Sequence, residues 1–370
     1  MKGRFANGAA VVFCLCLAAS ADAQWSVTNL HPEGATESRG LAASGSRQAG
    51  RQVLNGVQRA GFWSGTAASW VDLNPTGAST SSQANAMHGS QQAGYARVGG
   101  LFRASLWSGT AASWVDLSPP GSQESSVLAL SDLHQAGFVV VGARQHASIW
   151  SSTAASWVDL NPTGSEISFA YAVSGSQQAG VAFVGGRNRA SMWHGTPASW
   201  VDLNPSGSTD SKAFAASGSQ QSGYADVGGI RRASLWSGTS ASWVDLHPLT
   251  ATSSTVFAAG GSFQAGSAFV GGVPSASFWS GTSASWLNLH SLLPSHFTSS
   301  TAWGMSTDGI NIYVTGHGFN TQTLRNEALL WTRPVPEPSG LAALSLGVVL
   351  LRRSKRQNVR WRPSKLSRRA

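Results

Sequence analysis

One stretch of the chain decides its fold: RASMWHGTPASWVDL, residues 189–203. It holds two tryptophans seven residues apart, and the same pattern recurs along the chain at a spacing of 43 or 44 residues. The tryptophan pairs are Trp63/Trp70, Trp107/Trp114, Trp150/Trp157, Trp193/Trp200, Trp236/Trp243 and Trp279/Trp286. A repeat of about 40 to 45 residues is typical of a β-propeller in which each repeat forms one four-stranded blade.

Each copy divides into four short β-strands separated by Gly- and Ser-rich turns. In the copy that contains the quoted stretch we expect strand A at 169–174, strand B at 179–184, strand C at 190–193 and strand D at 200–203. The body shows no helical period, which excludes repeats built from two helices. A β-solenoid is the structural alternative, but its coils are usually shorter than this repeat. The sequence therefore predicts an all-β fold.

The two ends of the repeat array complement each other. Residues 25–30 form a lone D-type strand, and the last copy stops after a C-type strand at 328–331. Joining these parts gives a seventh blade, which seals the ring and leaves no open sheet edge. We therefore expect a seven-bladed β-propeller of 43-residue, four-stranded repeats over residues 24–333, with its last blade closed by the N-terminal strand.

Strand A alternates small and large side chains. An alanine recurs three residues before the turn glycine (Asp132 in one copy) that follows this strand, and the residue before it is large in five of six copies. The alanines are Ala42, Ala86, Ala129, Ala172, Ala215 and Ala258. Innermost strands of a propeller converge on the axis, where only small side chains fit between blades. This pattern predicts that strand A is the innermost strand.

The repeats resemble the HAF-type repeats of extracellular bacterial proteins. The resemblance covers nearly all of residues 25–331 and rests on the segments AVS at 172–174, QAG at 178–180, RASMW at 189–193 and VDL at 201–203. It implies a repeat fold and a location at or outside the cell surface. It implies no catalytic activity.

The first 23 residues have the layout of a secretory signal peptide. Lys2 and Arg4 precede an apolar run at 9–19, and the small residues Ala21 and Ala23 mark a cleavage site. Both cysteines of the chain lie in this segment, so the mature chain would hold none. Its stability must then come from burial of a core rather than from disulfide bonds.

Residues 334–370 form a tail of three consecutive parts: a Pro-rich turn, an apolar run and a basic cluster. The parts are Val335, Pro336, Glu337 and Pro338; residues 340–351; and the cluster that opens with Arg352 and Arg353. Twelve apolar residues are fewer than the roughly 20 of a full membrane span. Followed by arginines, the run still suits a transient stop at the inner membrane.

This order resembles the PEP-CTERM sorting signal of exopolysaccharide-producing Gram-negative bacteria. The resemblance implies an exosortase-type processing protease as a partner, with transient inner-membrane association through 340–351. An alternative is that the tail is retained as a weak membrane anchor. We expect an exported protein of the cell surface or extracellular matrix.

The net charge of +9 belongs to the ends of the chain. Residues 352–370 carry nine basic residues and no acidic one, whereas 24–351 carry 14 basic and 15 acidic residues. A nearly neutral body does not have the charge of a nucleic-acid-binding protein. We therefore expect no nucleic-acid partner.

Two residue types recur in most copies and invite a functional interpretation. The Asp of the W-V-D-L segment could form a ring of metal-binding carboxylates, but hairpin geometry places it opposite a Ser, and we expect a structural Ser–Asp hydrogen bond. The expected pairs are Ser105/Asp116, Ser148/Asp159, Ser191/Asp202 and Ser234/Asp245. The Trp pairs could stack on sugars, but opposed aromatic residues across a hairpin are ordinary sheet stabilisers.

The sequence contains no marked catalytic or metal site. The nine histidines show no metal-ligand spacing, and the mature chain would have no thiol ligand. There is no nucleophile elbow, no P-loop and no dinucleotide fingerprint. We expect no cofactor, no metal and no catalytic residue, and we interpret the protein as a non-enzyme.

The turns between strands B and C differ from copy to copy and are rich in arginine. In an antiparallel blade these turns and the D–A connections emerge on the same face, so that face could determine specificity. The candidate binding residues are Arg59, Arg103, Arg144, Arg187, Arg189, Arg231 and Arg232. The leading hypothesis is a face that binds an acidic polysaccharide or an envelope protein. A lectin-like propeller that takes neutral sugars between its blades is the alternative, and a hydrolase or lyase at the channel mouth is the third reading.

Overall fold

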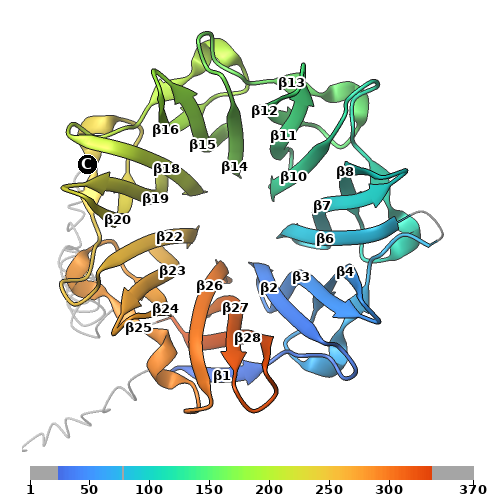
Figure 1. The fold of residues 1–370 in the computed structure, drawn as a ribbon, viewed down its shortest axis with the longest axis vertical. Coiled ribbons are helices and arrows are strands. Elements are labelled where there is room, and N and C mark those ends of the chain that lie inside the picture. The colour runs from blue at the N-terminus through green and yellow to red at the C-terminus, as the bar shows by residue number, and fades with distance from the viewer. Residues whose placement is uncertain (1–23, 77–78, 336–370) are drawn as a thin grey trace, which may run out of the picture. The chain divides into compact units, whose positions relative to one another are not determined.

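A computed structural model describes residues 24–76 and 79–335 of the chain. Within these residues seven four-stranded antiparallel sheets surround a central axis, and short 3₁₀ turns are the only helical segments (Figure 1). The propeller occupies one compact unit, Trp25–Pro334. The seven-bladed β-propeller predicted from the sequence is confirmed.

Six of the blades each take their four strands from one continuous segment. Blade 1 contains β2 (Glu37–Ser44), β3 (Arg47–Leu54), β4 (Val57–Trp63) and β5 (Val71–Asp72). Blade 2 contains β6 (Ser79–His88), β7 (Gln91–Val98), β8 (Leu101–Trp107) and β9 (Val115–Asp116). Blade 3 contains β10 (Ser125–Leu130), β11 (Gln135–Val141), β12 (Arg144–Trp150) and β13 (Val158–Asp159). Blade 4 contains β14 (Ser168–Ser174), β15 (Gln177–Val184), β16 (Arg187–Trp193) and β17 (Val201–Asp202). Blade 5 contains β18 (Ser208–Ser217), β19 (Gln220–Val227), β20 (Ile230–Trp236) and β21 (Val244–Asp245). Blade 6 contains β22 (Ser253–Gly260), β23 (Phe263–Val270), β24 (Val273–Trp279) and β25 (Leu287–Asn288).

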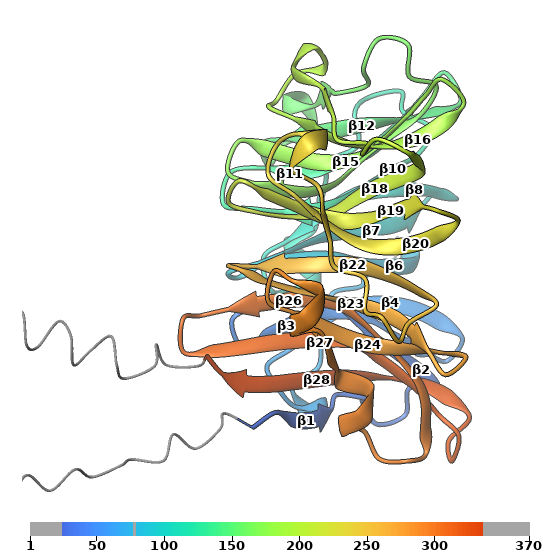
Figure 2. The same ribbon diagram turned by 90° about the vertical axis from the view of Figure 1, so that its left-hand side faces the viewer.

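Blade 7 joins the two ends of the described chain. It consists of β26 (Phe297–Thr307), β27 (Asn311–Asn320), β28 (Arg325–Pro334) and β1 (Ser26–Asn29). β1 runs antiparallel to β28, and the backbone N–H of the fully buried Leu30 continues the pairing at 2.8 Å from the carbonyl oxygen of Ala328 (Figure 2). The N-terminal strand therefore closes the last blade, as the sequence predicts.

Strand D is shorter than expected, and a 3₁₀ turn lies in the C–D connection that precedes it. In blade 4, η4 (Pro197–Ser199) precedes Trp200, and β17 covers two residues only. The turns at the same place in other blades are η1 (Ala67–Ser69), η2 (Ala111–Ser113), η3 (Ala154–Ser156), η5 (Ser240–Ser242) and η6 (Ser283–Ser285), and η7 (Leu289–Leu292) follows β25.

Every innermost strand carries a β-bulge, which the sequence analysis did not predict. In blade 4 the register shifts between Ala170 and Ala172, so Tyr171 is the extra residue. The bulge presses the carbonyl oxygen of Phe169 against Gly180 of strand B, where a Cβ atom would lie 1.9 Å from that oxygen. The glycine of the recurring QAG segment is therefore required by this close approach.

A buried serine on each innermost strand ties its blade to the preceding blade. In blade 4 the hydroxyl of Ser168 accepts a 2.9 Å hydrogen bond from the backbone N–H of Ala147 in blade 3. The same bond occurs at all seven interfaces, and Ser38 makes it with the N–H of Ala328 across the ring closure. Each of these bonds satisfies a strand C N–H that would otherwise be buried without a partner. We call this contact the serine latch.

The first tryptophan of each pair packs between two blades. Trp150 of blade 3, for example, is fully buried against Leu106 and Leu117 of blade 2. Trp279 and Trp331 also donate their indole N–H to carbonyl oxygens of the preceding blade. The tryptophans are structural, as predicted. The second member of each pair packs against the core cluster that contains the first, as Trp157 does with Trp150. A ring contact within a pair is found for Trp63 and Trp70, with centroids 4.5 Å apart, where Gly61 leaves space for the second ring.

Several predicted features lie outside the described residues. They are the cleavage-site residues Ala21 and Ala23 and the sorting-motif residues Pro336, Glu337, Pro338, Arg352 and Arg353, whereas Val335 is the last residue described. No helix in 24–76 or 79–335 is long and apolar enough to cross a membrane.

Candidate binding face

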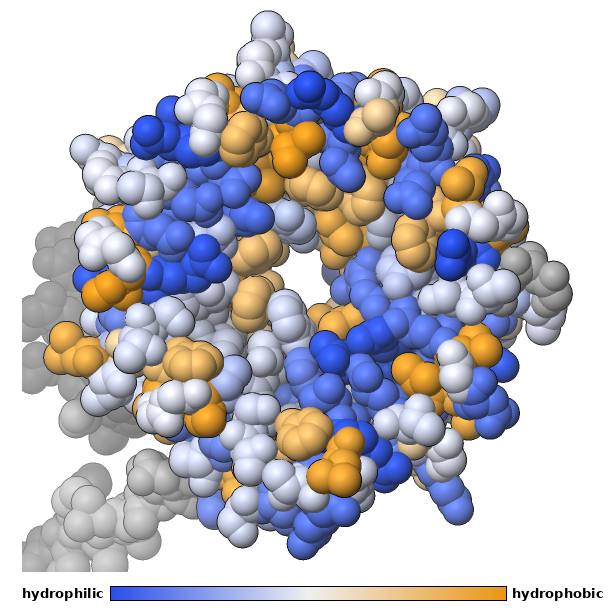
Figure 3. All heavy atoms as spheres, in the orientation of Figure 1, coloured by the Kyte–Doolittle hydropathy of each residue, from blue (hydrophilic) through white to orange (hydrophobic). Residues whose placement is uncertain are grey.

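The two faces of the ring differ in how much they vary between blades. The A–B and C–D turns form one face, which we call the constant face. There a buried strand B glutamine joins the two turns: in blade 4, Gln178 donates to the carbonyl of Ser176 and accepts from the N–H of Gly195. The B–C and D–A connections form the opposite face, which we call the variable face and which Figure 3 displays.

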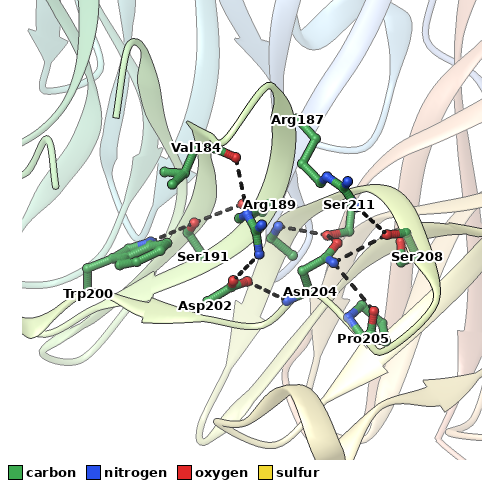
Figure 4. A network of polar contacts seen from close by, with 11 residues as sticks. Val184, Arg187, Arg189, Ser191, Trp200, Asp202, Asn204, Pro205, Ser208 and Ser211 are labelled. Carbon is green, nitrogen blue, oxygen red and sulfur yellow. Dashed lines mark hydrogen bonds and ion pairs between the residues drawn. The ribbon is translucent and has the colours of Figure 1, made fainter. Parts of the chain in front are cut away.

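Four of the predicted arginines form an ion pair with the Asp of the W-V-D-L segment in their own blade. In blade 4 a guanidinium nitrogen of Arg189 lies 2.6 Å from Oδ2 of Asp202 (Figure 4). Oδ1 of the same carboxylate accepts from the backbone N–H of Asn204, which begins the D–A connection. The other three pairs are Arg59/Asp72, Arg103/Asp116 and Arg232/Asp245, at 2.8 or 2.9 Å. Both carboxylate oxygens of the Asp therefore have a partner, one in the ion pair and one in the D–A connection.

The expected Ser–Asp hydrogen bond was wrong, although its register was right. Ser191 does lie opposite Asp202. Its hydroxyl instead donates to the carbonyl of Arg189 and accepts the indole N–H of Trp200, at 2.8 and 2.9 Å. The same arrangement occurs at Ser105, Ser148 and Ser234. The longer side chain of the neighbouring arginine reaches the carboxylate, and the second tryptophan takes the serine.

The strand C cation and the strand D acid change together between blades. Blade 3 pairs His146 with Asp159 at 2.7 Å. Blade 6 has Ser275 and Asn288 at these positions, so both charges are absent there. In blade 7 the pattern is reversed, because Asn29 donates to Glu327 at 2.8 Å. Such coupled replacement indicates a structural pair and leaves the outer edge of the variable face close to neutral.

Burial raises the pKa of Glu327 in blade 7, but hydrogen bonds outweigh this effect. Donors from Asn320, Thr323, Asn29 and Arg325 lower the pKa to about 2. The carboxylate therefore stays charged, and Arg325 compensates it at 3.0 Å.

The remaining three predicted arginines are more exposed. Arg144 lies 3.4 Å from Glu166 of the next blade, and Arg231 binds Asp226 at 3.0 Å while its guanidinium covers the ring of Tyr224. Arg187 approaches the carbonyl oxygen of Ser208 at 3.5 Å and has no carboxylate partner among the described residues (Figure 4). Six of the seven predicted arginines are therefore paired with an acidic side chain.

The bulge residues of the innermost strands line the central channel. They are Leu41, Asn85, Leu128, Tyr171, Phe214, Phe257 and Trp303. Rings of neighbouring blades touch along part of this belt, with centroid distances of 5.0, 5.5 and 4.3 Å from Tyr171 to Trp303. Equivalent residues of successive blades meet in this way only close to the axis, so the belt marks the channel wall.

The strand A residue two positions before each bulge lies nearer the variable face. We call these residues and their strand B partners the inner rim, and they differ in every blade. The strand A residue and its strand B partner are Arg39/Arg51, Gln83/Tyr95, Ser126/Phe138, Phe169/Val181, Lys212/Tyr224, Thr255/Ser267 and Thr301/His317. In Figure 3 hydrophilic surface borders the opening beside blades 1 and 2, and hydrophobic surface borders it beside blades 3 and 4. The inner rim is the least symmetric part of the ring.

In blade 1 this rim holds a cluster that sequence reasoning missed. Arg39 and Arg51 both bind the same oxygen, Oε1 of Glu37, at 2.7 and 3.0 Å. Blade 7 adds His317. Burial of this side chain, together with the positive charges of Arg39 and Arg51, lowers its pKa to about 3. We call Glu37, Arg39, Arg51 and His317 the inner-rim cluster. The signal that could have found it is a pair of arginines at two positions where the other copies together carry one charged residue, Lys212.

A small cavity lies between blades 3 and 4 on the constant face. It has a volume of about 170 Å³. Its lining includes His134, Trp150, Ser151 and His194, together with Gln178. The two histidines replace residues that are not histidine in the other copies. This is the kind of site that the neutral-sugar alternative requires.

The described residues contain no group of three or more His, Cys, Asp or Glu side chains arranged to hold a metal ion.

No protein family and no curated protein matches the sequence. Among solved structures the chain is similar to the β-propeller domain of the Trilobed protease from Pyrococcus furiosus, with a TM-score of 0.50 and 9% identity over 82% of this chain and 98% of that one. It is similar to a prolyl endopeptidase with a TM-score of 0.50 and 12% identity, over 79% of this chain and 48% of that one. TolB from Acinetobacter baumannii aligns with a TM-score of 0.39 and 11% identity, over 66% of this chain and 64% of TolB. At these identities the likeness is one of fold alone.

Proposed function

We propose that this protein is an exported, non-enzymatic propeller whose variable face binds an acidic polysaccharide of the cell surface or extracellular matrix. The observation that carries the proposal is a set of cations on this face that do not each have a carboxylate partner of their own. Arg39 and Arg51 share one carboxylate, and Arg187 and Lys212 have no carboxylate at ion-pair distance within the described residues.

The structure changes which arginines support this proposal. The outer-edge arginines are neutralised by Asp partners, and exposed ion pairs of this kind contribute little on their own. Arg39 and Arg51, which share one carboxylate, and Arg187, which has none among the described residues, remain able to bind anionic groups. Several weak contacts on one polymer chain would act together through effective concentration.

Export and processing are part of the same proposal and rest on the two terminal segments. Protein recovered from outside the producing cell should begin at or near Gln24 and lack the residues beyond 351. Intact-mass measurement of the extracellular fraction tests this, and full-length protein there would contradict it.

Binding is tested by retention on immobilised polygalacturonate, with dextran as the neutral control. We expect retention on polygalacturonate that falls steeply as salt rises from about 50 to 300 mM, because screening weakens contacts between exposed charges. Equal retention on both polymers would contradict the proposal, as would retention on neither.

The neutral-sugar alternative is favoured by the cavity between blades 3 and 4. Its volume of about 170 Å³ suits a single sugar ring, and its polar lining carries no acidic or basic group other than histidine. Salt-independent binding of a neutral oligosaccharide, lost in His194→Ala and unchanged in Arg39→Gln, would support this alternative.

A further inference from the structure

We infer that the inner-rim cluster is a subsite for one carboxylate group of an acidic sugar, at the mouth of the channel between blades 7 and 1. The inference rests on the proposed function and deepens it by assigning the residues that recognise the anion.

The cluster carries one more positive charge than it can neutralise internally. Arg39 and Arg51 face each other across β2 and β3, and both use Oε1 of Glu37. The three side chains are 20 to 30% exposed, so they are partly removed from water. Burial and the neighbouring Arg39 lower the pKa of Arg51, against the attraction of Glu37. The second cation is attracted by Glu37 but repelled by the first, so the arrangement adds little stability, whereas an anionic ligand would remove the imbalance.

Both guanidinium groups retain free donors that reach solvent. Arg39 uses Nε and Arg51 uses one terminal nitrogen for Glu37. None of their nitrogens is among the buried side-chain atoms that lack a hydrogen-bond partner. The unused N–H groups therefore point into accessible space, where a planar carboxylate can accept two of them at once.

His317 adds a neutral donor beside the two arginines. Its Nδ1 lies 3.1 Å from the indole nitrogen of Trp303 and accepts a hydrogen bond from that N–H. Because the ring is neutral, its own proton is then on Nε2. The imidazole can donate to an anion without adding a third repelling charge to the cluster.

The opposite neighbour, blade 2, supplies no second carboxylate at this level. Gln58 of blade 1 donates to the hydroxyl of Tyr95 of blade 2 at 2.8 Å, and within blade 2 Gln83 donates to Asn85 at 2.6 Å. These groups are polar and uncharged, which leaves the excess charge of blade 1 uncompensated. They also provide amide and hydroxyl groups of the kind that bind sugar hydroxyls. Trp303 and the aromatic belt lie deeper in the channel and provide apolar surface.

The inner-rim cluster occurs only once in the described ring, which distinguishes it from the contacts that build every blade. The serine latch occurs at all seven interfaces and the strand C–strand D pair varies in a coupled way, whereas two facing arginines occur in blade 1 alone among the seven described blades. A feature that one repeat carries and six lack is not needed to build a blade.

The test is titration calorimetry of the full propeller with trigalacturonic acid, and with its methyl ester as a neutral compound of the same shape. We expect the acid to bind and the ester to bind at least tenfold more weakly, since an ester cannot pair with the guanidinium groups. Arg39→Gln and Arg51→Gln should each weaken binding of the acid about tenfold, and Arg47→Gln on the constant face is the matched control. Equal affinities for acid and ester would overturn the subsite.

A second variant keeps the inference testable where an arginine variant fails to fold. Glu37→Gln removes the competing carboxylate, so affinity for the acid should rise several-fold. Unchanged or lower affinity in a folded Glu37→Gln protein would overturn the inference. If polygalacturonate is still retained by Arg39→Gln and Arg51→Gln but lost in Arg187→Gln, the subsite is wrong while the proposed function stands. If a sulfated trisaccharide binds and trigalacturonic acid does not, the assignment to a carboxylate is wrong.

Discussion

At the outer edge of the variable face four strand C arginines each meet one aspartate, whereas at the inner rim of blade 1 two arginines meet one glutamate. The outer pairs recur from blade to blade, and where the cation is lost the acid is lost or exchanged as well. The inner cluster occurs once and is not balanced. In a repeat protein, recurrence therefore identifies the contacts that build the ring, and imbalance in a single copy identifies a candidate site.

The largest effect on stability should come from removing the N-terminal strand that closes the ring. Deleting residues 25–30 removes β1, the fully buried Leu30 and the pairing with β28. We expect a loss of at least about 5 kcal/mol of stability, because a large buried side chain and a paired strand edge are lost together. Thermal unfolding and size-exclusion chromatography measure the outcome, with Ser26→Ala as the control. An unchanged melting temperature in a monomeric deletion variant would contradict the closure.

The second effect is the loss of folding stability at low pH that the buried His317 of the inner-rim cluster causes. The pKa of His317 is lowered to about 3 by burial and by Arg39 and Arg51, whereas in the unfolded chain it is about 6.5. Between these values the unfolded state binds a proton that the folded state does not, so stability falls as pH falls. The contribution between pH 6.5 and 4 is on the order of 3 kcal/mol. Melting temperature against pH should fall less steeply in His317→Gln than in the unchanged protein, and parallel curves would contradict this prediction.

A smaller effect is expected at one serine latch. Ser168→Ala removes the acceptor of the Ala147 N–H at a fully buried position. We expect a loss of about 1 to 3 kcal/mol, which is the usual cost of a buried donor left without a partner. Urea unfolding is the measurement. Ser176→Ala, at an exposed position on the constant face, should change stability by less than about 0.5 kcal/mol. Equal effects of the two substitutions on stability would show that the serine latch does not stabilise the ring.

The smallest effect on stability should come from removing the charge of one aspartate in an outer Arg–Asp pair. Asp202→Asn keeps the oxygen that accepts from the Asn204 N–H, as Asn288 and Asn29 do in blades 6 and 7. Stability should change by no more than about 1 kcal/mol, since the pair is partly exposed. Freed from its partner, Arg189 should increase retention on polygalacturonate at low salt. Reduced retention in the folded variant would show that the pair, not the free cation, serves binding.

The blades and their closure could be predicted from the sequence because they depend on spacing. Tryptophan pairs at a constant period and complementary halves at residues 25–30 and 328–331 leave few arrangements of strands. The bulge at Tyr171 and the role of Gly180 were not predicted, because a one-residue shift in pairing leaves no mark in the hydrophobic pattern. The 3₁₀ turn before Trp200 was not predicted either.

The candidate site was predicted less well because charge balance depends on side-chain reach. Spacing places Ser191 opposite Asp202, but it does not reveal that Arg189 is long enough to take the carboxylate. The predicted arginine face therefore proved largely paired. Facing residues on strands A and B can be found only once the register is known, so Arg39 and Arg51 were not singled out.

The central claim is tested most directly by comparing two single variants, Arg39→Gln and Arg189→Gln, for retention on polygalacturonate at about 50 mM salt. Both remove one guanidinium from the variable face, and circular dichroism and melting curves establish that both are folded. The account predicts that Arg39→Gln loses most of the salt-sensitive retention and that Arg189→Gln keeps it, because only the first removes uncompensated charge. Equal losses, or a greater loss in Arg189→Gln, would contradict the claim that the unrepeated inner-rim cluster binds the acidic polymer.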